Sequence, residues 1–202
     1  SLCAPPLARI GRPAPPVSAA MLLVEIADFL LQTVAVILGV TLLARAYMNY
    51  LGLPARNPLA QFAIALTDWL VRPLRRLARA AGRLDFATLL AAALVAVVFV
   101  SLRFLLAGLA MASWPLPGLL LMAMIELLRW ALYLVLWLTL LHAVLSWVNP
   151  HAPIAPAVSI LARPFLAPFQ RALPLVGGID LSPLVVILIV NVMLIVLARS
   201  GV

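Results

Sequence analysis

Four stretches of this chain are long and apolar enough to cross a lipid bilayer, and they constrain its fold more than any other feature. They cover about residues 26–50, 86–109, 126–148 and 181–198. A spanning helix needs about 20 mostly apolar residues. Backbone groups inside hydrocarbon must satisfy their own hydrogen bonds, so each stretch is expected to be helical. The sequence therefore predicts an all-α membrane protein with four transmembrane helices.

The charge composition agrees with lipid as the surrounding medium. Of the 202 residues, 66% are hydrophobic and 10% are charged, whereas an average soluble domain is about 45–50% apolar and about 25% charged. The 14 basic residues are all arginine and outnumber the 6 acidic residues. These arginines lie between apolar stretches rather than on a polar domain. The expected partner is therefore anionic membrane lipid and not nucleic acid.

The first 20 residues differ from the rest of the chain. Residues 1–20 are rich in proline and lack the apolar centre of a secretory signal, so they are predicted to be a disordered extension. Met21 is then a candidate start of the natural protein. The single cysteine, Cys3, cannot form a disulfide within the chain and says nothing about compartment.

A basic amphipathic segment separates the first two apolar stretches. Projected at about 100° per residue, its apolar face consists of Leu59, Phe62, Leu66, Trp69, Leu70, Leu74 and Leu77. The opposite face consists of Gln61, Asp68, Arg72, Arg75, Arg76 and Arg79. This pattern is typical of helices that lie in the membrane interface, and it predicts that these four arginines bind anionic lipid. A solvated loop with a charge run is the alternative, and Pro73 is expected to kink the segment.

The stretch between the third and fourth spans repeats this arrangement, with apolar Val158, Leu161, Phe165 and Phe169. Its prolines, Pro164, Pro168 and Pro174, are expected to break it into short pieces.

Arginine placement also predicts orientation. The loop between the first two spans carries Arg56, Arg72, Arg75, Arg76, Arg79 and Arg83, and the loop between the last two carries Arg163 and Arg171. The connection over residues 110–125 carries none. Positively charged loops stay in the cytoplasm, so both hairpin loops are predicted to be cytoplasmic.

The two halves of the chain are related by an internal repeat. Residues 73–85 align with residues 168–180 without a gap, which places Arg76 on Arg171 and Asp85 on Asp180. The units cover residues 21–112 and 119–202 and are joined by a linker at 113–118. Two spans per unit return the chain to its starting side, so the hairpins are predicted to be parallel repeats.

The second unit carries residues that point to a known family. The runs Arg163–Pro174 and Gly177–Pro183, and the ending Leu145–Pro150, resemble the signature of the YggT (YlmG-related) membrane proteins. The first unit departs from it, with Asp85–Thr88 at the corresponding turn. The resemblance covers about residue 21 to the end and implies a multi-pass protein of the bacterial plasma membrane. Its members are linked to osmotic tolerance, ion homeostasis, membrane organisation and plastid cytochrome assembly, without an agreed biochemical activity.

The sharpest motif is the turn that precedes the fourth span. It contains Gly177, Gly178, Asp180, Ser182 and Pro183. In the structural interpretation, the glycines permit a tight turn, the serine caps a helix and the proline occupies its first turn. In the functional interpretation, Asp180 and Asp85 form an ion or partner site beside Arg171 and Arg76.

Few other polar residues lie in the spans. Glu126 and Arg129 are three residues apart and are predicted to form an ion pair on one helix face. His142 is interpreted as an interfacial hydrogen-bonding group rather than a haem ligand, and Asn191 as a hydrogen-bonding partner of a neighbouring helix. The sequence contains no paired metal-ligand spacing, phosphate loop or activated nucleophile. We therefore expect no catalytic residues, no metal and no cofactor.

Two functions remain. A membrane scaffold or assembly factor, in envelope organisation or osmotic tolerance, fits the basic segments and the scarcity of charge within the spans. Its partners would be anionic lipids and other membrane proteins, including further copies in a homo-oligomer. The alternative is a component of potassium or sodium transport, or a small channel, but a pore usually needs more polar residues inside the spans.

Overall fold

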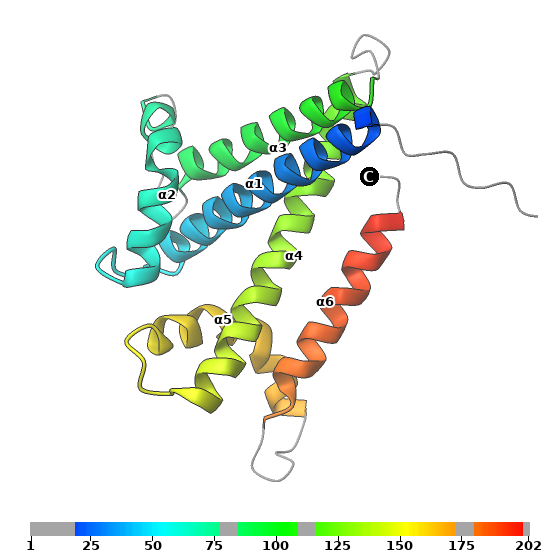
Figure 1. Ribbon diagram of the computed structural model, residues 1–202. Coiled ribbons are helices and arrows are strands. Elements are labelled where there is room, and N and C mark those ends of the chain that lie inside the picture. Colours follow the sequence, from blue (N-terminus) through cyan, green and yellow to red (C-terminus); the bar gives the residue numbers. More distant parts are fainter. Residues whose placement is uncertain (1–18, 77–84, 109–115, 173–179, 200–202) are drawn as a thin grey trace, which may run out of the picture.

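Six helices make up the described part of this protein. The computed structural model describes residues 19–76, 85–108, 116–172 and 180–199. The helices are α1 (Ala19–Tyr50), α2 (Pro58–Leu74), α3 (Phe86–Leu106), α4 (Leu116–Val148), α5 (Ala155–Ala172) and α6 (Ser182–Arg199) (Figure 1). Helices α1, α3, α4 and α6 are each long and apolar enough to cross a membrane. The described ranges contain no strand, so the predicted all-α membrane protein is confirmed.

Helix α4 extends beyond the predicted third span. Helix α4 begins at Leu116, ten residues before the predicted start of the third span, because no charged residue interrupts the chain before Glu126. Three residues of the predicted linker at 113–118 therefore belong to α4, in whose first turn Pro117 is well tolerated. The proposed extension at 1–20 lies outside the described residues, apart from the first two residues of α1.

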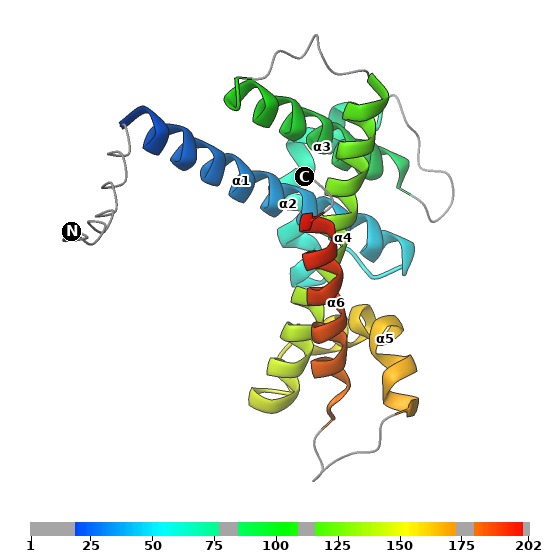
Figure 2. The same cartoon turned by 90° about the vertical axis from the view of Figure 1, so that its right-hand side faces the viewer.

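The helices form two units of the same design. In the first, α1 and α3 pack as an antiparallel pair and the short α2 packs against both; in the second, α4, α6 and α5 repeat the arrangement. Helix α1 crosses α4 steeply, so the α1–α3 pair lies across the α4–α6 pair (Figure 1 and Figure 2). We call the end of the molecule that carries α2 and α5 the loop end, and the opposite end the terminal end.

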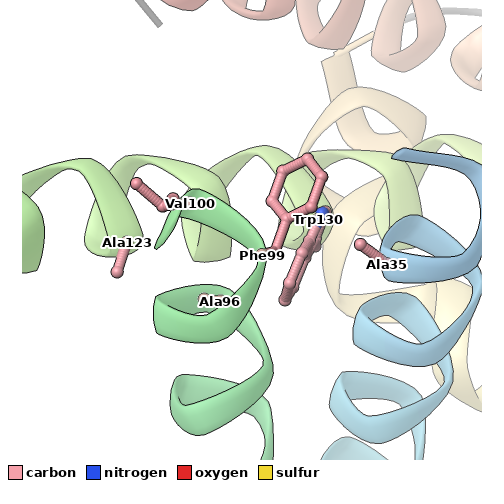
Figure 3. Packing of buried hydrophobic residues seen from close by; sticks show 6 residues of the cluster. All are labelled: Ala35, Ala96, Phe99, Val100, Ala123 and Trp130. Atoms are coloured by element: carbon pink, nitrogen blue, oxygen red, sulfur yellow. The ribbon is translucent and has the colours of Figure 1, made fainter. Parts of the chain in front are cut away.

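Small residues allow the two units to approach closely. The fully buried indole of Trp130 on α4 packs against Ala35 of α1 and against Ala96 and Phe99 of α3 (Figure 3). It also lies directly on Gly39 of α1, where any Cβ atom would come closer to the ring than real Cβ contacts do. A glycine at this crossing therefore lets α1 reach α4.

A second junction joins the units at the loop end. The hydroxyl of Tyr47 on α1 donates to the carbonyl oxygen of Leu161 on α5 at 3.1 Å. The rings of Tyr47 and Phe165 have their centroids 5.9 Å apart. Met48 of α1 and Leu138 of α4 lie in the same buried cluster, so this contact is continuous with the core.

Helix α2 does not present a single apolar face to the bundle. Its buried residues are small or of moderate size: Ala60, Ala63, Thr67 and Val71. Phe62 and Trp69, which were predicted to share the apolar face, are 65% and 66% exposed. The small residues allow α2 to pack on α1 and α3, so the large aromatic side chains point away from the protein. Leu77 and Arg79 lie outside the described residues.

The prolines act differently from the prediction. Pro73 lies inside the last turn of α2, one residue before the helix ends at Leu74. Helix α5 continues through Pro164 and Pro168 as one helix, and the predicted division into short pieces is wrong for the described residues. At the start of α2, Asn57 accepts the N–H of Leu59 at 3.1 Å, and Pro58 follows as a suitable first residue.

Candidate functional site

Asp85 joins the three helices of the first unit at the loop end. It is the N-cap of α3: its Oδ1 accepts the N–H of Thr88 at 3.2 Å and its Oδ2 accepts the hydroxyl of Thr88 at 2.7 Å. Oδ2 also accepts the side-chain amide of Asn49 on α1 at 2.9 Å and the guanidinium of Arg75, directly after α2, at 3.2 Å. One buried carboxylate thus ties the ends of α1, α2 and α3 together.

These donors keep Asp85 ionised. Burial raises the pKa of Asp85, but hydrogen bonds from the hydroxyl and N–H of Thr88 and the positive charge of Arg75 lower it by more. The pKa therefore lies below its ordinary value.

Asp180 occupies the equivalent place in the second unit. Its Oδ1 accepts the N–H of Ser182 at 2.9 Å, and its Oδ2 accepts the side-chain amide of Gln170 at 2.8 Å. Burial raises the pKa of Asp180, but hydrogen bonds from Ser182 and Gln170 and the nearby charge of His142 lower it by more, so the pKa also lies below its ordinary value. The carboxylate, rather than the serine hydroxyl, receives the first N–H of α6.

The structure corrects the predicted neighbours of these two acids. Asp85 pairs with Arg75 rather than Arg76, and Asp180 pairs with Gln170 rather than Arg171. Arg75 and Gln170 correspond in the repeat, so a cation in one unit is replaced by a neutral amide in the other. Ser182 and Pro183 are buried at the start of α6. Gly177 and Gly178 lie outside the described residues.

Arg45 is a buried charged residue of α1 at the loop end. Its side chain is only 4% exposed. Its Nη1 donates to the hydroxyl of Thr67 at 3.0 Å and its Nη2 to Asp68 at 3.3 Å. Asp68 also pairs with Arg72 at 2.6 Å. A buried charge is stable only when it is paired, and α2 supplies the partner. At the corresponding place in the second unit, the hydroxyl of Ser159 and Nδ1 of His142 are 3.4 Å apart.

A second group of charges lies toward the terminal end. Arg129 donates to Glu126 at 2.8 Å, which confirms the predicted pair, and both side chains are buried. The guanidinium of Arg103 on α3 pairs with Asp28 of α1, with donor–acceptor distances of 2.8 and 3.4 Å, and lies 5.7 Å from the ring centroid of Phe99. Arg103 is thus paired within the protein near the end of α3. No local pattern connects it to Asp28, because 75 residues separate them in the chain.

At the loop end, the acidic and the basic side chains differ in their hydrogen bonding and exposure. The described acids there, Asp68, Asp85 and Asp180, each accept hydrogen bonds from neighbouring side chains or backbone. The arginines of the helix surfaces and loops are instead exposed, namely Arg56, Arg72, Arg75, Arg76, Arg163 and Arg171. The loop end therefore offers a basic surface, which we call the basic face. Among the described residues, no group of three side chains is arranged to hold a metal ion.

Comparisons with known proteins agree with this two-unit structure. The family model described as CCB3/YggT matches residues 24–109 and 121–200. Over 165 residues the chain is 34% identical to the uncharacterized protein YggT of Escherichia coli K12, covering 81% of this chain and 85% of that protein. It is 31% identical over 159 residues to an uncharacterized protein encoded in the proC 3' region of Vibrio alginolyticus, covering 78% and 85%. No solved structure matches the chain.

The family assignment follows from where these matches fall. One matched segment contains most of α1 together with α2 and α3, and the other contains most of α4 together with α5 and α6. The chain is therefore a member of the CCB3/YggT family and carries two tandem copies of the family's helical unit.

Proposed function

We propose that this protein is a scaffold or assembly factor of the bacterial plasma membrane, and that it recruits anionic lipid to the basic face. The proposal rests on one contrast at the loop end: the acidic side chains accept hydrogen bonds within the protein, whereas the arginines are exposed. Such a surface attracts negatively charged headgroups over roughly a Debye length. The relatives' printed names describe no activity, so the proposal rests on the geometry of this chain.

Helix α2 supports a defined position for such a lipid. Trp69 and Arg72 are three residues apart on α2, so they share one exposed stripe of the helix surface, and the exposed Arg76 follows just after the end of the helix. Next to this stripe, an apolar groove of about 280 Å³ lies between α1 and α3, and Trp69 and Leu70 contribute to its lining. An acyl chain fits the groove while its headgroup meets the arginines, an arrangement typical of interfacial helices.

The same surface supports the orientation that we propose. Anionic lipids give the cytoplasmic leaflet its negative potential, and arginine-rich loops remain on that side during insertion. With α2 and α5 in the cytoplasm, the basic face meets this leaflet. We propose that lipid held there positions the protein for membrane organisation or osmotic tolerance.

Lipid binding is tested with the purified full-length protein in mild detergent. Native mass spectrometry would measure how much phosphatidylglycerol is retained relative to phosphatidylcholine. An arginine near the membrane surface contributes about 1 kcal/mol to the binding of anionic lipid, so Arg76→Gln should reduce this preference about fivefold. Arg199→Gln, at the exposed far end of α6, is the matched control and should change it much less. Equal effects of the two substitutions would refute a lipid site at the basic face.

The two ion pairs at the terminal end favour a second candidate, a role in ion transport. Asp28, Arg103, Glu126 and Arg129 bring ionisable groups from α1, α3 and α4 into the spans, and such groups often mark ion pathways. We rank this candidate second because these four side chains already pair with one another. We expect no saturable potassium or sodium flux in liposomes. A reproducible flux that is lost in folded Glu126→Gln protein would reverse the ranking.

A further inference from the structure

Helix α6 carries an exposed amide at the middle of its span. Asn191 lies nine residues after Ser182 and eight before Arg199, the two ends of the helix. At about 1.5 Å per residue, it is about 13 Å from either end, at the depth of the bilayer centre. We predicted that Asn191 would bond to a neighbouring helix. Within the chain this is wrong, because its Nδ2 donates to the carbonyl oxygen of Ile187 in the same helix at 2.8 Å.

The amide retains unused hydrogen-bonding capacity. Among the described residues, its Oδ1 accepts no hydrogen bond, and one N–H of the amide is also free. Asn191 is exposed at the surface of the molecule, where the surrounding side chains are apolar. Hydrocarbon offers no donor to this oxygen, and asparagine is too short to reach the headgroups. A partner helix at the same depth would satisfy both groups.

The surface around Asn191 has the spacing of a helix–helix interface. Leu184, Leu188, Asn191, Ile195 and Ala198 follow one another at intervals of four, three, four and three residues, and all five are exposed. This heptad spacing forms one continuous seam along the helix. The opposite side of α6 is already used, because Val186 and Val190 pack with Leu132 of α4 and Leu166 of α5.

The arrangement of the molecule leaves the seam accessible. In Figure 2, α6 lies in front of α4, and no other described helix covers its near side. Figure 1 shows the same helix at the edge of the bundle. A second molecule can therefore approach α6 without displacing a packed element.

We propose that the protein forms a two-fold symmetric dimer through α6, with Asn191 of one protomer hydrogen-bonded to Asn191 of its partner. All copies insert in the same orientation, so a two-fold axis along the membrane normal pairs equal depths, and each Asn191 faces its own copy. An asparagine amide both donates and accepts, so two copies satisfy each other where a purely donating or accepting side chain would not. A buried asparagine in such a seam also sets dimeric state and register. This proposal is independent of lipid binding at the basic face.

Disulfide cross-linking in native membranes tests the geometry. In the full-length chain with Cys3→Ser, Leu188→Cys should form a covalent dimer on mild oxidation. Ile189→Cys is the matched control: the two side chains are adjacent and exposed, at 61% and 41%, but about 100° apart around the helix. Equally efficient cross-linking at both positions would overturn the seam. So would cross-linking at Leu188→Cys to a different protein without a homodimer.

Measurement of the dimer dissociation constant in lipid bilayers, by energy transfer between labelled copies, tests the role of the amide. Asn191→Leu should weaken the dimer about tenfold, the effect of an interhelical hydrogen bond in a membrane. The monomer should keep its stability, because the side chain bonds only to its own helix among the described residues. An unchanged dissociation constant, or a wild-type protein that stays monomeric at all protein-to-lipid ratios, would overturn the proposal.

Discussion

Gly39 of α1 and Trp130 of α4 meet where the two helices cross. We predict that substitution of Gly39 destabilises the protein when Trp130 is present but not when its ring is removed. In Gly39→Ala, the new Cβ would overlap the Trp130 ring, and the ring cannot move aside easily because it is fully buried. Overpacking of this kind costs up to about 3 kcal/mol. Alanine in place of glycine within a helix returns about 1 kcal/mol through helix propensity. The net expectation is a loss of about 2 kcal/mol in the free energy of unfolding.

Removing the ring should reverse this effect. In a Trp130→Leu background the obstacle is gone, so Gly39→Ala should become neutral or stabilising by up to about 1 kcal/mol. Unfolding by sodium dodecyl sulfate in mixed micelles, followed by circular dichroism, measures all four proteins. Gly52→Ala is a control for glycine substitution without a clash, since its Cβ would meet no atom within 4 Å, although its φ of 70° introduces local strain. An equal cost of Gly39→Ala in both backgrounds would refute the steric argument.

Four further predictions concern the stability and the pH dependence that Asp85 provides, the membrane topology and the hydrogen bond of Tyr47. Asp85→Ala should lower the free energy of unfolding by about 1–2 kcal/mol, because α3 loses its cap; the same unfolding assay checks this, and an unchanged midpoint would contradict it. Since the folded pKa of Asp85 is depressed, its contribution should be complete above pH ~4 and be lost as pH falls further, through the folded pKa; Asp85→Asn should flatten this part of the stability profile. Single cysteines at Gln61 and Pro117 should be labelled from outside intact cells only at Pro117, and labelling only at Gln61 would invert the proposed topology. Tyr47→Phe removes the hydrogen bond to Leu161 but keeps the ring, so it should cost about 1 kcal/mol in the unfolding assay, and no change would show that the ring contact alone joins the units.

Hydropathy and local spacing were enough to predict the architecture and part of the site. The four spans, the tandem units and the pairing of Glu126 with Arg129 were predicted from the sequence, because each depends on residues within one helix or on a repeated pattern. Asp85 and Asp180 were also named as candidate site residues from the sequence, but their hydrogen-bond partners were not predicted. In both units the partner is the residue one position before the expected arginine, and the direction of a side chain at a helix end cannot be obtained from alignment alone.

Only the tertiary structure decided which surfaces face protein and which face lipid. In a soluble protein, apolar residues mark the buried side of a helix, but in a membrane both sides are apolar. Side-chain size then decides the packing. Alanines of α2 and α3 and Gly39 of α1 face neighbouring helices, while Trp69 and Phe62 are exposed. The pairing of Arg45 with α2, and of Arg103 with Asp28, depends on these contacts between distant segments. The sequence by itself determined four helices that are long and apolar enough to span a membrane, and close packing of small residues determined how these helices meet.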